Sequence, residues 1–184
     1  EAGLELTTEM VALRENQTAG RVDFTRVNPK GSVPALALRD GNVLTEGAVI
    51  VQFIADLVPE KQLVPLAGSL ERYRVMEWLN FIGAELHKGF SPLFNPATGE
   101  AARAAAMAAI RNKLSHVVRA LEGRDYLMGS RFTVADAYLF TVLNWAGFVK
   151  LDLSPYPGLL AYQSRVAARP AVQQALRAEG LIKE

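Results

Sequence analysis

Residues 59–68, PEKQLVPLAG, separate two stretches of the chain whose apolar residues repeat with different periods. Two prolines and a glycine within ten residues are typical of a loop between structural units, because proline cannot continue a helix. Before this loop, short apolar runs alternate with turn residues, whereas every apolar pattern after it has helical spacing. The sequence therefore predicts a first domain over residues 1–58, a linker over 59–68 and an all-helical domain over 69–184.

The first part of the chain has the strand and turn signals of a small α/β unit. Apolar residues among threonines predict a strand over residues 4–13, and two apolar runs predict further strands over 33–38 and 42–45. Asp40 and Gly41 lie between the last two runs. This dipeptide indicates a β-hairpin, because glycine accepts the positive φ of a tight turn.

Helical patterns account for the rest of the chain. A helix beginning at Glu46 is predicted from apolar residues that share one face: Val49, Ile50, Phe53, Ile54 and Leu57. In the second part, helices are predicted over residues 69–90, 100–123, 157–168 and 170–179. Gly89, Pro92 and Pro96 are expected to break the first of these four helices.

One further helix is expected after Thr133, where the sequence TVAD has the spacing of a capping box. In this motif the Thr133 oxygen accepts the backbone N–H of Asp136, and the Asp136 carboxylate accepts the backbone N–H of Thr133. A carboxylate also suits the positive end of the helix dipole. The simplest interpretation is an ordinary structural cap that contributes about 1 kcal/mol.

Composition excludes several classes of function. The 184 residues carry a net charge of +1 with basic and acidic side chains interspersed, so the sequence predicts no face for nucleic acid or an anionic membrane. The chain contains no cysteine, which excludes disulfides, thiolate metal sites and a cysteine nucleophile within these residues. Its apolar runs fall short of the roughly 20 residues that span a membrane. No signal peptide and no metal site are predicted.

Four segments together resemble the glutathione S-transferase family, and within it the bacterial beta class. They are VNPKGSVPAL, LTEG, EWLNFIGAELHKGF and RFTVADAYLFTVL, and they keep the family's mutual spacing. The resemblance implies an α/β thioredoxin-like N-terminal domain followed by an all-α C-terminal domain. It also implies a cytoplasmic homodimer that acts in detoxification, with the helix over residues 69–90 contributing to the dimer interface.

The resemblance implies a glutathione site at two places in the first domain. The peptide bond between Val33 and Pro34 is cis in this family, and the backbone N–H and C=O of Val33 then pair with the cysteinyl part of glutathione as an added strand would. Glu46 and Gly47 would hold the γ-glutamyl group, although many relatives have serine in place of Gly47. Without the resemblance, Pro34 could simply begin an edge strand, and Glu46 could be a helix-terminal charge.

The resemblance also implies ligand contacts along the sequence AELHK. His87 would face the glutathione sulfur as the catalytic residue, and a neutral imidazole can either donate a proton to a thiol or accept one. The other implied glutathione-binding residues are Asn80, Ala84, Glu85, Leu86 and Lys88. Without the resemblance, a single histidine of this kind favours a structural role for His87. His116 has no motif around it and is interpreted as a surface or packing residue.

Compared with the family pattern, the chain is expected to lack about twenty residues before Glu1. These would form the first strand, which lies between the strands predicted over 4–13 and 33–38, and most of the first helix. In this family the loop between that strand and that helix carries the residue nearest the glutathione sulfur, which is cysteine in the beta class and serine or tyrosine elsewhere. Beta-class relatives often have a lysine that contacts the glycine carboxylate, and Arg14 is a candidate replacement here.

The predicted function is therefore that of a glutathione transferase. Glutathione serves as the co-substrate, and its thiol is activated for conjugation to small hydrophobic electrophiles or for thiol–disulfide exchange. The sequence leaves the electrophile unspecified. Two alternatives stay open at this point: a non-catalytic binding protein on the same scaffold, and a truncated, inactive product.

Overall fold

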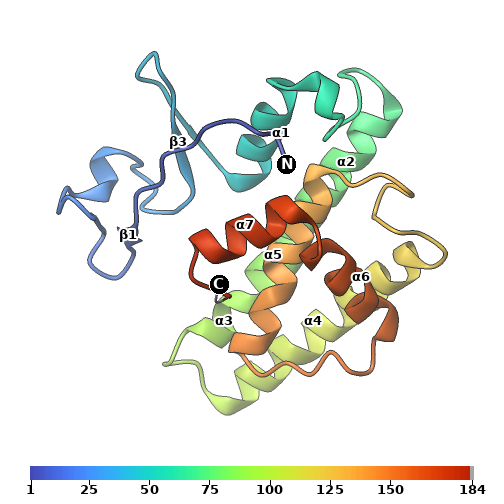
Figure 1. Cartoon of the computed structure of the whole chain (residues 1–184). Helices are drawn as coiled ribbons and strands as arrows, with labels where there is room; N and C mark the ends of the chain where they lie inside the picture. The colour runs from blue at the N-terminus through green and yellow to red at the C-terminus, as the bar shows by residue number, and fades with distance from the viewer. Residues whose placement is uncertain (183–184) are drawn as a thin grey trace. The chain divides into compact units, whose positions relative to one another are not determined.

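The computed structural model describes residues 1–182 of the chain (Figure 1). It divides into two compact units, one comprising Ala2–Lys61 and the other comprising Glu1 together with the residues from Gln62 onward. The boundary after Lys61 falls inside the segment 59–68, which the sequence predicts as a linker. The two units are described separately below.

The first unit contains two hairpins, one helix and two short 3-10 turns. Its elements are β1 (Val11–Ala12), β2 (Gln17–Thr18), η1 (Phe24–Arg26), β3 (Ala35–Ala37), β4 (Val43–Thr45), α1 (Gly47–Asp56) and η2 (Pro59–Lys61). The strands form two separate two-stranded antiparallel sheets, β1 with β2 and β3 with β4. Within the described residues, β3 is therefore hydrogen-bonded to β4 alone.

The strand predicted over residues 4–13 is wrong for most of its length. Only Val11 and Ala12 form a strand, and the apolar side chains of Leu4, Leu6 and Met10 are exposed. Alternating apolar residues form a strand only where another strand offers hydrogen bonds. Among the described residues, the only strand that β1 pairs with is β2.

The second hairpin and its helix confirm the sequence prediction. Leu36 pairs with Leu44, and Gly41 has a φ of +86° in the turn between the strands. The helix α1 follows directly and packs on both strands through its apolar face. This arrangement fixes the start of α1 beside the start of β3, because antiparallel pairing brings the end of β4 next to Ala35.

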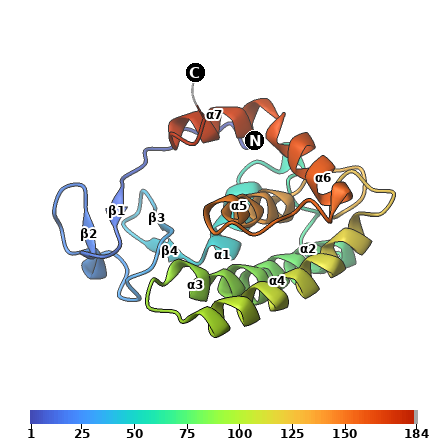
Figure 2. The ribbon, with the colours of Figure 1, turned by 90° about the horizontal axis from the view of Figure 1, so that it is seen from below.

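Within the described residues, the second unit consists of helices and loops, with one isolated β-bridge between Tyr126 and Gly129. Its elements are α2 (Leu70–Phe81), the π-turn η3 (Ile82–His87), α3 (Lys88–Phe94), α4 (Glu100–Leu121), α5 (Val134–Phe148), α6 (Pro157–Ala167) and α7 (Pro170–Ala178). Figures 1 and 2 show α5 running through the middle of this unit, where it packs on α2, the π-turn and α6. Ala135, Leu139 and Leu143 on α5 are almost completely buried and form the centre of the core.

The helix predicted over residues 69–90 does not break at Gly89. It continues through Pro92 to Phe94, and a π-turn interrupts it between Ile82 and His87. Phe90 and Leu93 are buried, and α3 packs on α4. Burial of these two large side chains outweighs the hydrogen bond that Pro92 cannot make.

The predicted capping box at the start of α5 is confirmed, and it extends into a buried polar cluster. The Asp136 carboxylate accepts the N–H of Thr133 at 2.9 Å, and it also accepts the N–H of Leu127 at 2.9 Å and the Tyr162 hydroxyl at 3.1 Å. Asp136 is fully buried, and burial raises the pKa of its carboxyl above the ordinary value. Asp136 therefore joins α5, α6 and the loop before α5, which is more than an ordinary cap does.

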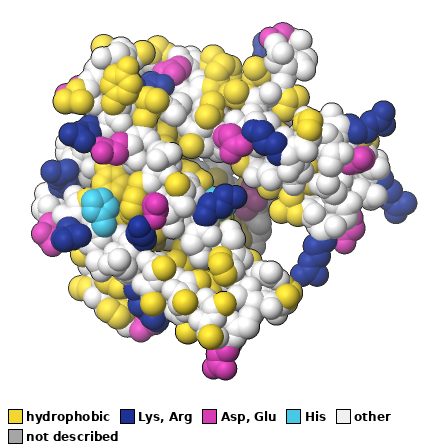
Figure 3. All heavy atoms as spheres, turned by 180° about the vertical axis from the view of Figure 1, so that it is seen from behind, with side chains coloured by type: hydrophobic (Ala, Val, Ile, Leu, Met, Phe, Trp, Pro, Cys, Tyr) yellow, Lys and Arg dark blue, Asp and Glu magenta, His cyan; other side chains and the backbone are white. Residues whose placement is uncertain are grey.

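The surface carries both signs of charge. Figure 3 shows Lys and Arg side chains intermixed with Asp and Glu side chains over the face that it displays. No helix within residues 1–182 is long and apolar enough to cross a membrane.

Candidate functional site

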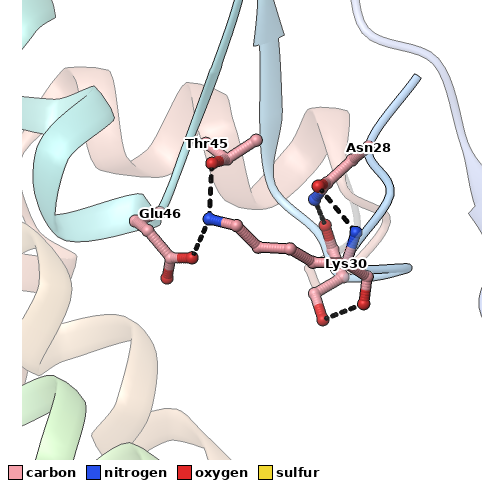
Figure 4. A network of polar contacts seen from close by, with 5 residues as sticks. Asn28, Lys30, Thr45 and Glu46 are labelled. Atoms are coloured by element: carbon pink, nitrogen blue, oxygen red, sulfur yellow. Dashed lines mark hydrogen bonds and ion pairs between the residues drawn. The ribbon is translucent and has the colours of Figure 1, made fainter. Parts of the chain in front are cut away.

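The junction between β4 and α1 places a cation and an anion at the start of a helix. Lys30 Nζ lies 2.7 Å from Glu46 Oε1 and donates to Thr45 Oγ1 at 2.9 Å (Figure 4). Both charged side chains are more than half exposed. Glu46 precedes the helix with a φ of +69°, and its carbonyl accepts the N–H groups of Val49 and Ile50. The carboxylate is therefore held outside the helix, beside its N-terminus.

A tight loop over residues 28–32 positions Lys30. Asn28 is buried, its side-chain amide donates to the Ser32 carbonyl at 2.6 Å, and its side-chain oxygen accepts the N–H of Lys30 at 3.1 Å (Figure 4). Gly31 has a φ of +62° in the same loop, and its N–H donates to the Asn28 carbonyl. Asparagine commonly closes such turns with its side chain. The loop thus fixes the backbone from which Lys30 extends toward Glu46.

The cis peptide bond expected between Val33 and Pro34 is present directly after this loop. The side chain of Val33 is exposed, and within the described residues its backbone N–H and C=O make no backbone hydrogen bond. A Cβ added at Gly47 would lie 3.6 Å from the Pro34 ring, which is ordinary van der Waals contact. The fold would therefore accept serine in place of Gly47.

These groups match the charges of an α-amino acid. The first turn of α1 has N–H groups without helical partners and contains no acidic residue, so it suits a carboxylate. The Glu46 carboxylate beside it suits an ammonium group. The backbone of Val33 offers one donor and one acceptor to an extended peptide.

His87 forms a second candidate site in the helical unit. It ends the π-turn, and its Nδ1 lies 2.9 Å from the hydroxyl oxygen of Tyr138 on α5. The Trp145 ring and the imidazole meet edge to face, with the ring centroids 4.6 Å apart. Burial lowers the pKa of His87 below its ordinary value of 6.5, and the adjacent Lys88 ammonium lowers it further. His87 is therefore neutral at pH 7.

The other residues predicted along AELHK lie in different environments. Ala84, Glu85 and Lys88 are exposed, and Glu85 forms an ion pair with Lys113 of α4 at 2.6 Å. Leu86 is completely buried in the helical core, so its side chain cannot contact a ligand and only its backbone could do so.

The π-turn also separates Asn80 from His87. Asn80 is exposed on α2, one residue before the last residue of that helix, whereas His87 is half-buried against α5. Seven residues place two side chains on the same face of a regular α-helix. A π-turn has longer i→i+5 hydrogen bonds, such as that from the Lys88 N–H to the Gly83 carbonyl, and it changes this register.

Comparison with known proteins identifies the family. The family description "Glutathione S-transferase, N-terminal domain" matches residues 1–57, and "Glutathione S-transferase, C-terminal domain" matches residues 81–170. The glutathione S-transferase GstA of Escherichia coli O157:H7 is 49% identical over 181 residues, which cover 98% of this chain and 90% of that protein. This chain belongs to the glutathione S-transferase family.

Solved glutathione S-transferases have the same fold as this chain. The structure of a sphingomonad glutathione S-transferase complexed with glutathione superimposes with a TM-score of 0.93 at 45% identity. The bacterial beta-class enzyme of Sphingomonas chungbukensis superimposes with a TM-score of 0.95 at 44% identity. Each alignment covers 98% of this chain and 90% of the other. The thioredoxin-like N-terminal domain and the helical C-terminal domain are thus confirmed, whereas the expectation of about twenty residues before Glu1 stays a prediction.

The sequence of this glutathione S-transferase does not predict several of the contacts made by its site residues. Asn28 and Lys30 lie in the motif VNPKGSVPAL, where the Asn-Pro pair signals a turn but no ion pair with a residue sixteen positions later. Tyr138 and Trp145 look like ordinary core aromatics of α5, and nothing local places them against His87. Within residues 1–182, no three side chains are grouped as a metal site would require.

Proposed function

We propose that this protein is a beta-class glutathione transferase that acts in the cytoplasm. It binds glutathione as its co-substrate and stabilises the thiolate. The thiolate sulfur then attacks a small hydrophobic electrophile and forms a carbon–sulfur bond, while the leaving group departs with its electron pair. The observation that carries this proposal is the start of α1, where helix N–H groups and the Glu46 carboxylate match the α-carboxylate and the ammonium of the γ-glutamyl group. The chain is also 49% identical to a glutathione S-transferase.

The γ-glutamyl and cysteinyl parts of glutathione have proposed partners in the first domain. The N–H groups of the first turn of α1, including that of Gly47, hold the γ-glutamyl carboxylate, and Glu46 holds the γ-glutamyl ammonium. The backbone of Val33 pairs with the cysteinyl part. In the helical domain, His87 interacts with the sulfur, and Asn80, Ala84, Glu85, Lys88 and the backbone of Leu86 complete the set of proposed glutathione-binding residues.

Glu46→Gln tests the γ-glutamyl contact. We expect glutathione to bind about fivefold to tenfold more weakly, because an ammonium loses a charged acceptor whose interaction is partly screened by solvent. Isothermal titration calorimetry gives the dissociation constants. Glutathione that lacks its amino group is the matched ligand control, since it should bind the wild type and Glu46→Gln equally.

Lys30→Met is the matched protein control for this experiment. It removes the same ion pair as Glu46→Gln but leaves the Glu46 carboxylate in place. If the loss came from the broken ion pair, Lys30→Met would weaken the binding of glutathione as much as Glu46→Gln does. Both variants would then also bind deaminated glutathione more weakly than the wild type. The proposed contact between Glu46 and the ammonium would then be wrong.

We also propose that the protein is a homodimer whose interface includes one face of α2. Leu70 and Tyr73 lie one helical turn apart on this face, and both of these large side chains are exposed. The nearby rings of Trp78 and Phe81 are only half-buried. An apolar face of this kind on a helix commonly marks a protein–protein contact.

Tyr73→Glu tests the proposed dimer. We expect it to shift the protein from dimer to monomer at micromolar concentration, because a carboxylate would lose its water on association. Light scattering coupled to size-exclusion chromatography measures the mass. Leu160→Glu on α6 places the same charge at an exposed apolar position away from α2 and should leave the dimer intact. A wild-type protein that elutes as a monomer would contradict the proposal.

A further inference from the structure

The hydrogen bond between His87 and Tyr138 joins two helices through side chains that are 51 residues apart in the sequence. The Tyr138 hydroxyl oxygen lies 2.9 Å from Nδ1 of His87, and the two rings meet edge to face with their centroids 5.9 Å apart. Trp145 also packs edge to face against His87, at 88° between the ring planes. The imidazole thus contacts two aromatic side chains of α5, and Nε2 is the ring nitrogen that does not take part in the Tyr138 bond.

The backbone of the π-turn also lies close to this hydroxyl group. A Cβ added at Gly83 would lie 3.4 Å from the Tyr138 oxygen, at the limit of a normal contact. Glycine at this position lets the hydroxyl lie against the turn, and the widened turn places His87 beside it. The charged groups nearby on the turn are Lys88, which adjoins His87, and Glu85, which pairs with Lys113.

Elementary acid–base chemistry decides which group donates in this bond. A phenol has a pKa near 10, which makes its O–H a far stronger acid than a neutral imidazole N–H. The imidazole nitrogen, in turn, is a better proton acceptor than a phenol oxygen. Since His87 is neutral at pH 7, the favoured arrangement has the Tyr138 O–H donating to Nδ1. The ring proton of His87 then resides on Nε2.

We propose that Tyr138 is a positioning residue that holds His87 as the Nε2–H tautomer, so that His87 donates a hydrogen bond to the glutathione thiolate. This inference rests on the proposed function. His87 then cannot act as the base at Nδ1, because that nitrogen is occupied by the Tyr138 proton. When the thiol S–H bond breaks, its electron pair stays on sulfur, the proton leaves to solvent, and the Nε2–H group stabilises the resulting anion.

The tautomer can be measured without any ligand. Nitrogen-15 NMR of the protein labelled at histidine distinguishes protonated from unprotonated ring nitrogens, and His116→Gln assigns the two histidines. We expect Nδ1 of His87 to be unprotonated and Nε2 to be protonated at pH 7.5. In Tyr138→Phe we expect a mixture of tautomers, whereas Tyr156→Phe, which removes a hydroxyl group elsewhere in the helical unit, should resemble the wild type. A protonated Nδ1 in the wild type would overturn the proposal, whether or not Tyr138→Phe folds.

The path of the thiol proton is a second, independent test. Calorimetric titration with glutathione in two buffers of different ionisation enthalpy gives the number of protons released on binding, and S-methylglutathione, which has no thiol proton, gives the background. We expect net proton release that matches the fraction of thiolate seen by ultraviolet absorbance. Thiolate formation without proton release would mean that His87 keeps the proton, and this would overturn the donor role.

The kinetic effect should separate binding from the reaction step. Tyr138→Phe is expected to lower kcat about twofold to tenfold with KM nearly unchanged, the effect of one lost neutral hydrogen bond. A rise in KM alone would contradict a positioning role. If the protein binds no glutathione at all, the proposed function is wrong, while the NMR experiment still decides whether Tyr138 sets the tautomer of His87.

Discussion

Asp136→Ala is expected to lower the free energy of unfolding by about 3–4 kcal/mol, the largest stability loss predicted for this chain. The substitution removes the carboxylate that accepts four buried donors: the N–H groups of Thr133 and Leu127 and the hydroxyl groups of Thr133 and Tyr162. Of these donors, the Tyr162 hydroxyl keeps a second acceptor, the Asp136 carbonyl at 3.3 Å. Each unsatisfied buried donor costs about 1–3 kcal/mol. Part of that sum is offset because the substitution also removes a buried carboxylate, and desolvation disfavours its charged form and raises its pKa. Urea denaturation followed by circular dichroism measures the change.

An exposed aspartate that caps a turn provides the control for Asp136→Ala. Asp152 accepts the N–H of Ser154 at 2.8 Å in the same unit, but it is exposed to solvent. Asp152→Ala should cost no more than about 1 kcal/mol, as an ordinary cap does. If Asp136→Ala cost as little as Asp152→Ala, Asp136 would be a simple helix cap and the buried cluster would carry no special weight.

His87→Ala is expected to lower kcat/KM for conjugation by about 10- to 100-fold. A hydrogen bond to a charged group contributes about 1.5–3 kcal/mol, and His87 is proposed to make such a bond to the thiolate sulfur. The loss should appear mainly in kcat, since the γ-glutamyl and cysteinyl contacts of glutathione remain. Steady-state kinetics with a small aromatic electrophile measures it, and circular dichroism confirms the fold.

The second histidine of the chain serves as the matched control for His87→Ala. His116 lies on α4 and stacks on Trp78 with the ring centroids 5.4 Å apart. It is exposed and has no role in the proposed site. His116→Ala should keep kcat/KM within about twofold of the wild type. Equal kinetic losses in the two variants would show that His87 is structural, as the sequence alone also allowed.

Features that depend on near neighbours in the sequence could be predicted. The hairpin at Asp40 and Gly41 and the capping box at Thr133 and Asp136 follow from residues at most three positions apart, and the structure confirms both. The strand over 4–13 was wrong because a strand needs a partner, and the helix continued past Pro92 because tertiary burial outweighed a local breaker.

The chemically important contacts of the site depend on distant residues, which is why the sequence could not predict them. The contact of Lys30 with Glu46 needs the β3–β4 pairing, and the contact of Tyr138 with His87 needs both the π-turn and the packing of α5. Family resemblance indicated where glutathione would be held. It did not indicate which nitrogen of His87 would carry the proton.

The titration of the thiol of bound glutathione tests the central claim most directly. Ultraviolet difference absorbance of the thiolate, recorded from pH 5 to 10 with saturating glutathione, gives the apparent pKa of the bound thiol for the wild type and for His87→Ala. We predict that the wild type lowers this pKa below that of free glutathione, and that His87→Ala returns it toward the free value, at about 1.4 kcal/mol for each pH unit. A bound thiol that titrates like free glutathione in the wild type would contradict the claim that this protein stabilises the thiolate.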